Sequence, residues 1–170
     1  MAEKILFQTT LVQLDSVDKD GVGTIRRDEF GRAFRYTKNR NATAFTAKQP
    51  VCFDVGNIGT IALLKSVNSP VTADLMVQAG IAMTAIAASG GLCYGWVQQK
   101  GYFQDARVVG VSGTAIAVGD ELVAANATTT LTRATAVGTA SKRQFTFQAL
   151  EAVSAATSSV YAKDVYINCL

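Results

Sequence analysis

The chain has 170 residues and a formal net charge of +3, and 49% of its residues are hydrophobic while 17% are charged. This length fits one domain, and this composition excludes a disordered chain, which buries too little apolar surface to fold. The small positive charge gives no support to a nucleic acid or an anionic membrane as the main partner, because surfaces that bind them are strongly basic.

The beginning of the chain is predicted to stand apart from the rest. In Ile5–Val12, the alternation of Ile5, Phe7, Thr9 and Leu11 follows the period of a strand. We therefore expect residues 1–17 to form an N-terminal arm and residues 18–170 to form a single β-rich domain. Such an arm is suited to pair with the sheet edge of a neighbouring subunit, because an unpaired edge accepts an added strand.

Residues 18–29 match part of the pattern of an EF-hand calcium loop. Asp18 and Asp20 stand at the first and third ligand positions, and Glu29 stands at the last. Val22, however, occupies the fifth position, where calcium needs an oxygen, and neither flank shows the period of a helix. We predict an ordinary acidic turn without a metal, and a calcium-binding module is the alternative from a different functional class.

Basic residues are concentrated in one stretch that also contains Phe34, Tyr36 and Phe45. They are Arg26, Arg27, Arg32, Arg35, Lys38, Arg40 and Lys48. Basic patches with aromatic residues bind single-stranded nucleic acid. Arginine and lysine stems also cover apolar surface on a solvated hairpin, which then faces an acidic partner protein. We favour the second interpretation and expect no nucleic-acid partner.

The rest of the chain alternates turn-like clusters with short segments rich in Val, Ile, Thr, Tyr and Phe, which favour strands. Gln148–Val153 equally fits the start of a helix, although we favour a strand there. The apolar stretch Leu75–Val97 is interrupted by polar residues and glycines, so no membrane span is expected. The predicted fold is all-β, a small β-sandwich or open β-barrel. The expected strands are Phe34–Thr37, Gly95–Val97, Arg107–Val111, Phe145–Phe147 and Val160–Leu170.

Catalytic and cofactor motifs are missing from the sequence. It contains no histidine, which excludes Ser-His-Asp and Cys-His catalysis and histidine-based zinc sites. Neither a P-loop nor a glycine-rich dinucleotide turn is present. Cys52, Cys93 and Cys169 lie far apart in sequence and are expected to be buried free thiols. We expect neither an enzyme nor a cofactor.

Three parts of the chain resemble the capsid decoration, or cement, proteins of tailed bacteriophages. Gly23–Asn39 is similar to an early hairpin of those proteins, and Gly91–Gln98 is similar to a glycine-flanked aromatic strand near their middle. Thr114–Val123, Phe147–Ala152 and the strand ending at Leu170 look like their C-terminal hairpins. The resemblance implies a non-catalytic virion protein, made in the cytoplasm of the bacterial host, that sits on the outer surface of the capsid. It further implies a homotrimer that bridges subunits of the major capsid protein.

Other virion components share the β-rich composition, so a tail-tube, head-fibre or head-completion protein is the alternative within the same class. Aromatic residues often anchor interfaces, although core packing is an equal alternative for Trp96, Tyr102 and Phe103. The expected capsid or subunit interface comprises Leu6, Gln8, Leu11, Val12, Phe34, Arg35, Tyr36, Trp96, Tyr102 and Phe103.

Overall fold

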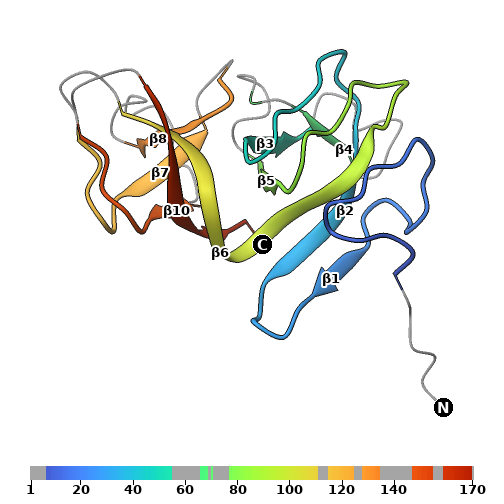
Figure 1. Cartoon of the computed structure of the whole chain (residues 1–170), viewed down its shortest axis with the longest axis horizontal. Coiled ribbons are helices and arrows are strands. Elements are labelled where there is room, and N and C mark those ends of the chain that lie inside the picture. Colours follow the sequence, from blue (N-terminus) through green and yellow to red (C-terminus); the bar gives the residue numbers. More distant parts are fainter. Residues whose placement is uncertain are drawn as a thin grey trace.

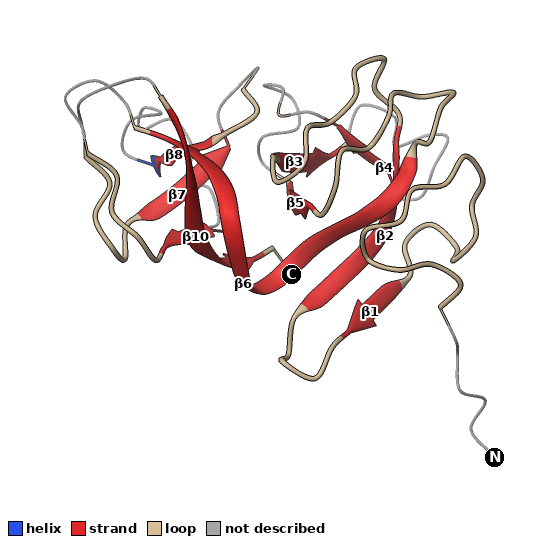
Figure 2. Ribbon diagram, viewed as in Figure 1, coloured by secondary structure: helices blue, strands red, loops and turns tan. Residues whose placement is uncertain are grey.

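The computed structural model of the chain describes residues 7–54, 66–68, 70, 77–110, 115–124, 128–134, 147–154 and 159–169. These residues form β-strands joined by turns and loops (Figure 2). None of them lies in an α-helix, and the short blue piece in Figure 2 is a 3₁₀ turn at Ala134. The predicted all-β class is therefore confirmed. The strands are β1 (Ile25–Arg27), β2 (Ala33–Asn39), β3 (Pro50–Phe53), β4 (Ser66–Asn68), β5 (Gln78–Ala82), β6 (Tyr94–Val109), β7 (Glu121–Ala124), β8 (Leu131–Arg133), β9 (Phe147–Ala149) and β10 (Val160–Asn168).

The strands close into two five-stranded rings that share β6. The first ring runs β6–β2–β4–β3–β5 and returns to β6, and the second runs β6–β10–β9–β7–β8 and returns to β6. Figure 1 shows the two rings side by side, with the long β6 passing from one to the other. The barrels are closed rather than open, and closure removes free strand edges. Strand β1 is attached to the outer edge of β2.

Strand β6 serves both rings because it has 16 residues and bends in the middle. Its first half pairs with β2 and β5, and its second half pairs with β10 and β8. The bend lies at Gly101, whose φ is +96°. A Cβ at this position would lie 2.8 Å from Cγ of Arg32, so the close approach of the β1–β2 hairpin requires glycine here.

The buried amide of Gln98 supports this bend. Its Nε2 donates to the backbone carbonyls of Lys100 and Tyr102, at 3.1 and 2.8 Å. These two carbonyls lie on either side of Gly101. A buried polar group that is fully paired in this way fixes a single backbone path.

Lys48, in the segment before β3, ties the two rings together on the side of β5. Its backbone N–H donates to the Ala82 carbonyl at 2.9 Å in the first ring, and its carbonyl accepts from the Arg107 N–H at 3.2 Å in the second. Its Nζ forms an ion pair with Asp105 at 2.8 Å. Lys48 and Asp105 are also the non-glycine residues with left-handed backbone, at φ 64° and 59°, among the residues that the structure describes.

Each ring encloses apolar side chains, and a third cluster lies outside the first ring. Val51, Val67 and Val97 belong to the core of the first ring, while Leu122 and Val165 belong to that of the second. Phe34, Tyr36 and Trp96 form the third cluster, which Phe7, Leu11 and Tyr94 cover in part. Cys52 and Cys93 are buried thiols, as expected, whereas the thiol of Cys169 is only partly buried.

The expected strands from Phe34 to Thr37, from Gly95 to Val97 and from Val160 onward are confirmed as parts of β2, β6 and β10. The strand expected over Ile5–Val12 is wrong for its described part, since residues 7–12 form bends and a turn. Their alternating apolar residues do not follow a sheet edge; Phe7 and Leu11 pack on the aromatic cluster instead. Phe145 and Val111, at the ends of two expected strands, lie outside the described residues.

Gly80 in β5 provides a test of the close contact between β5 and β6. Its φ is +131°, and an added Cβ would lie 2.0 Å from the backbone oxygen of Gln98. Gly90, in an exposed turn, also has positive φ, at +101°, but an added Cβ would meet nothing within 4 Å. We expect Gly90→Ala to lower the free energy of unfolding by about 1–3 kcal/mol, the cost of the backbone conformation alone.

Gly80→Ala is expected to lower the free energy of unfolding by a further amount of about 1–3 kcal/mol, because the strands must move apart. Urea unfolding of both variants measures the difference. Equal losses for the two variants would show that the approach of β5 to β6 does not depend on glycine.

Candidate interaction surface

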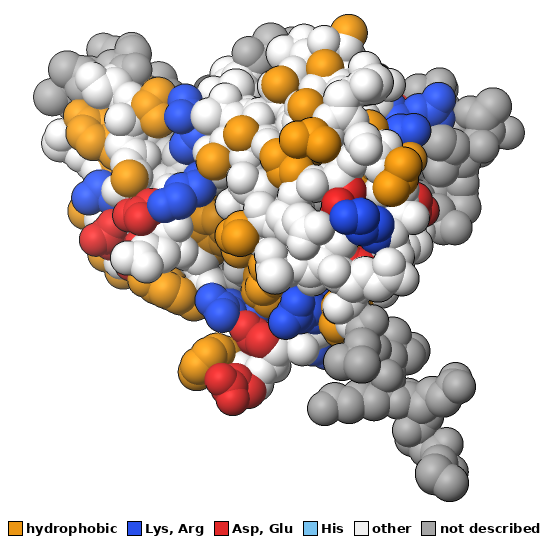
Figure 3. Space-filling view, turned by 45° about the vertical axis from the view of Figure 1, so that its right-hand side comes forward, with side chains coloured by type: hydrophobic (Ala, Val, Ile, Leu, Met, Phe, Trp, Pro, Cys, Tyr) orange, Lys and Arg blue, Asp and Glu red, His pale blue; other side chains and the backbone are white. Residues whose placement is uncertain are grey.

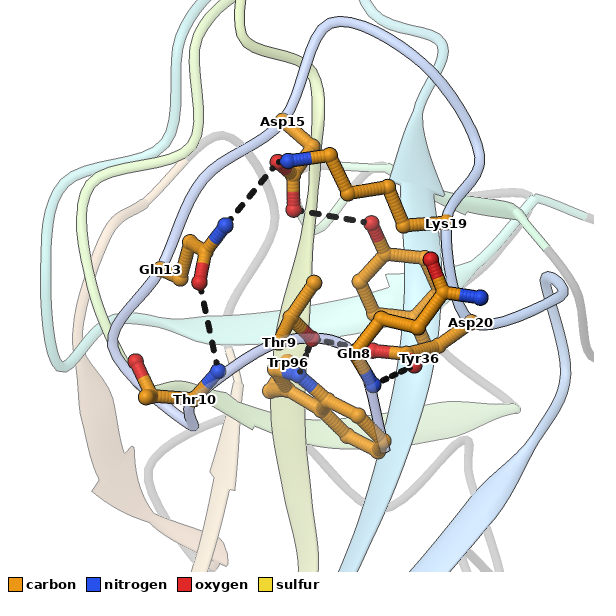
Figure 4. Close-up of polar contacts among 9 residues, drawn as sticks. All are labelled: Gln8, Thr9, Thr10, Gln13, Asp15, Lys19, Asp20, Tyr36 and Trp96. Atoms are coloured by element: carbon orange, nitrogen blue, oxygen red, sulfur yellow. Dashed lines mark hydrogen bonds and ion pairs between the residues drawn. The ribbon is translucent and has the colours of Figure 1, made fainter. Parts of the chain in front are cut away.

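Residues 7–20 lie against the aromatic cluster of their own chain (Figure 4). The Phe7 ring packs edge-on to Trp96, with 5.7 Å between ring centroids. Trp96 Nε1 donates to the Thr9 hydroxyl at 2.9 Å, and that hydroxyl donates to the Asp20 carboxylate. Asp20 also accepts from the backbone N–H of Gln8 at 2.7 Å. The described part of the predicted arm is thus held by its own barrel, and its exchange with a neighbouring subunit stays a prediction.

Asp15 is the buried centre of this attachment. It forms an isolated antiparallel bridge with Tyr94, and its carboxylate accepts from Lys19 at 2.6 Å, Gln13 at 3.2 Å and the Tyr36 hydroxyl at 3.3 Å. Burial alone raises the pKa of Asp15, but the hydrogen bonds from Lys19, Gln13 and Tyr36 and the charge of Lys19 outweigh it and hold the pKa below its ordinary value. Burial and the charge of Asp15 raise the pKa of Tyr36.

The EF-hand-like loop uses its carboxylates for other purposes. Asp18 accepts from the backbone N–H groups of Gly21 and Val22, at 2.8 and 3.0 Å, as in an Asx-type turn. Asp20 is occupied by Gln8 and Thr9. Glu29 lies in the β1–β2 turn, at the far end of β1. The three residues of β1 span about 10 Å, and this length separates Glu29 from Asp18 and Asp20 along the chain. Nowhere among the described residues do three or more acidic or cysteine side chains gather closely enough to hold a metal ion.

Several cations of the basic stretch lie over aromatic rings of the same chain. The charged groups of Arg26 and Lys38 lie 5.2 and 5.1 Å from the ring centroids of Phe7 and Tyr94. Arg35 lies 5.8 Å from Phe53. These contacts are the arrangement expected of a hairpin whose basic stems cover apolar surface.

The β1–β2 turn presents the most exposed large hydrophobic side chain of the described residues, Phe30, which is 75% exposed. The turn is held by Asp28, whose carboxylate accepts from the backbone N–H of Phe30 at 3.1 Å and of Arg32 at 3.0 Å. The same carboxylate forms an ion pair with Arg32 Nε at 2.6 Å. Gly31 completes the turn with φ +75°. In Figure 3 this turn is the knob of hydrophobic and acidic side chains that projects at the lowest point of the described surface.

Arg32 connects the projecting turn to the body of the protein. Its guanidinium lies between the rings of Phe30 and Phe34, at 5.4 and 5.7 Å from their centroids. Its stem lies against Gly101, at the bend of β6. The turn that carries Phe30 is therefore attached to the point where the two barrels meet.

A second exposed aromatic feature lies on the outer face of β6 and β10. Tyr102 and Tyr166 are directly opposite each other and are 45% and 42% exposed. The Tyr102 hydroxyl donates to the Asp164 carboxylate. This hydrogen bond and the nearby negative charges raise the pKa of Tyr102.

The ten residues of the predicted interface fall into separate environments. Phe34, Tyr36, Trp96 and Phe103 are core residues, with side chains at most 5% exposed, so core packing is the structural role of these aromatic residues. Gln8, Val12 and Tyr102 are exposed, and Leu11 and Arg35 are partly buried. Arg35 is held by Gln99 and the Gly23 carbonyl, at 2.9 and 3.2 Å. Leu6 lies outside the described residues.

Phe30 was not among the predicted interface residues. The local sequence Asp28-Glu-Phe-Gly31 carries the signal, because an Asp followed by a Gly three residues later is typical of a tight turn. An aromatic residue inside such a turn has no neighbouring strand to cover it, and exposure is the expected result.

Comparison with known proteins gives little. No protein-family model and no curated protein matches the chain. Among solved structures, it is similar to the N base of head fibre gp8.5 in bacteriophage phi29, with 13% sequence identity and a TM-score of 0.45. The match covers 80% of this chain and 95% of that chain, and its TM-score lies below the level that establishes a common fold. In the described part of the chain, no helix of a length and hydrophobicity that would span a membrane is found.

The attachment of the N-terminal segment is expected to depend on pH through Asp15. Since the pKa of Asp15 is lower in the folded chain than its ordinary value of 3.8, its stabilising contribution is complete above that pH and is lost as the pH falls through the folded-state value. The free energies of unfolding of the wild type and Asp15→Asn should therefore differ most near neutral pH and converge below 3.8. A difference in urea stability that stays constant between pH 6 and pH 3 would contradict this role.

Proposed function

We propose that the chain is a non-catalytic structural protein of a bacteriophage virion, and more specifically a decoration protein that binds the outer surface of the capsid. Phe30 is the observation that carries this proposal. It is an aromatic side chain, 75% exposed, on a turn that Asp28 and Arg32 hold in place. Exposed aromatic groups on a preformed support are the usual anchors of protein interfaces.

The sequence resemblance supplies the identity of the partner in this proposal, the major capsid protein. Binding only the assembled shell would stabilise that shell by mass action, by an amount set by the protein's concentration relative to its affinity. A homotrimer is the proposed form, because three linked copies of one weak site add avidity. The closed barrels suit such a role, since a scaffold without free ring edges keeps its shape under load.

The alternatives within the same class are a head-fibre, a tail-tube or a head-completion protein. The phi29 chain described above belongs to a head fibre. Copy number distinguishes these roles. Quantitative mass spectrometry of purified particles is expected to find this protein in a ratio to the major capsid protein that lattice symmetry sets. A handful of copies per particle would instead indicate a fibre, tail or vertex component, and absence from particles would exclude the virion role.

The anchor itself is tested with Phe30→Ala. Cosedimentation with purified shells that lack the protein measures the affinity, which should fall by about tenfold or more, as for the loss of an interface hot spot. The melting temperature should stay near that of the wild type, because Phe30 buries little surface in its own chain.

Val118→Ala provides the matched control. Val118 is also an exposed apolar side chain, 66% exposed, but it lies beside the second ring, far along the chain from the β1–β2 turn. This variant should bind shells like the wild type. Equal affinities of Phe30→Ala and the wild type would refute Phe30 as the anchor.

A further inference from the structure

Strand β1 stands out in the topology because it has one neighbour among the strands that the structure describes. Each strand of the two rings has a hydrogen-bonded neighbour on both sides, and β1 pairs with β2 alone among the described strands. Figure 1 shows β1 at the outer margin of the first ring. A strand edge of this kind is a template for an added strand from another chain.

The register of the hairpin shows which backbone groups face outward. Tyr36 N–H donates to the Thr24 carbonyl at 2.9 Å, and Asp28 N–H donates to the Arg32 carbonyl at 3.2 Å. In an antiparallel pair, hydrogen-bonded positions alternate with positions whose N–H and C=O groups point away. Because positions 24 and 28 face β2, the N–H and C=O groups of Ile25 and Arg27 point to the open side.

The side chains along this edge define the chemistry that it would accept. Ile25 is 41% exposed and Arg27 is exposed, while Arg26 on the other face lies over Phe7. Neither arginine forms an ion pair with a carboxylate of the described residues. A second strand placed here would therefore meet an apolar side chain and two positive charges, next to the Phe30 turn.

We propose that the open edge of β1 accepts an extended, acidic segment of a partner protein as an added strand. The added strand would hydrogen-bond to Ile25 and Arg27 and would place carboxylates opposite Arg26 and Arg27 and an apolar side chain opposite Ile25. Cross-strand pairs of opposite charge stabilise a sheet, and like charges directly opposite destabilise it. This assignment rests on the proposed binding role of the same hairpin, and it names the partner's chemistry.

A second copy of this chain is a poor occupant of the edge. In a two-fold antiparallel pair that overlaps all of β1, Ile25 faces Arg27 of the other copy and Arg26 faces Arg26. Two like charges then lie directly opposite each other at the centre of the pair. The charge of the edge therefore favours a different, acidic chain.

The test uses the full chain and two short synthetic peptides with blocked ends. One has the central sequence Val-Glu-Glu-Val, and its control has Val-Lys-Lys-Val; each reads the same in both directions, so strand polarity need not be known. The acidic peptide should slow amide hydrogen exchange at Ile25 and Arg27 and bind about tenfold more tightly than the basic one. Equal binding of the two peptides, or protection outside the β1–β2 hairpin, would overturn the proposal.

Variants of the edge sharpen this result. Arg27→Glu should remove the preference, so that the two peptides bind with similar affinity, because the new carboxylate offsets the charge of Arg26. Ile25→Pro removes an outward N–H without removing a bond to β2, and it should abolish binding, whereas Ile25→Ala keeps that N–H and should retain binding. Self-association of the wild type that is lost in Ile25→Pro would assign the edge to a second copy and overturn the acidic partner.

The peptide experiment and the shell experiment fail independently. If Ile25→Pro binds shells as the wild type does and no peptide binds, the strand-acceptor proposal is wrong while the decoration role stands. If the acidic peptide binds the edge and shells do not bind the chain, the decoration role is wrong and the edge serves another acidic partner.

Discussion

The continuity of β6 through both barrels is the constraint on which the rest of the structure depends. A single strand with partners on both sides along both halves cannot move in one ring without moving in the other. Its bend needs a glycine at position 101 and an internal amide, Gln98, that satisfies the carbonyls on both sides. Lys48 then bridges the rings from outside the strand. These few groups set the angle between two otherwise complete barrels.

The β1–β2 hairpin takes its position from that bend. Arg32 lies against Gly101 and between two phenyl rings, and Asp28 fixes both Arg32 and the turn. The exposed ring and the open strand edge are therefore carried by a hairpin that these contacts attach to the bend of β6. Binding groups built on a rigid support lose less entropy when they engage a partner, which gives small contacts more affinity than their area suggests.

The sequence predicts the class of fold well and its closure poorly. Segments with aromatic or β-branched residues, such as those around Phe34 and Val160, are strands because local preference and burial agree there. The strand predicted from the alternation at Phe7 and Leu11 is wrong because those residues cover aromatic side chains from β2 and β6. Only the tertiary structure brings those aromatic side chains together. The sharing of β6 is likewise invisible locally, since it depends on pairings with strands far away in sequence. Aromatic residues were expected at the interface, yet Phe34 and Trp96 are buried, and the burial of these two depends on contacts between segments far apart in sequence. The exposure of Phe30, by contrast, follows from its place in a local turn.

The shared strand also has a consequence for how the chain acquires its structure during synthesis. The first ring needs only segments up to the first half of β6. The second cannot close until β10 has left the ribosome, and β10 lies 51 to 68 residues after its partner positions in β6. Between these events the second half of β6 carries unpaired backbone groups and apolar side chains such as Phe103 and Val108. A nascent chain with an exposed half-strand is prone to pair with its neighbours on the same polysome, so the order of strands along the chain sets a window in which assembly and aggregation compete.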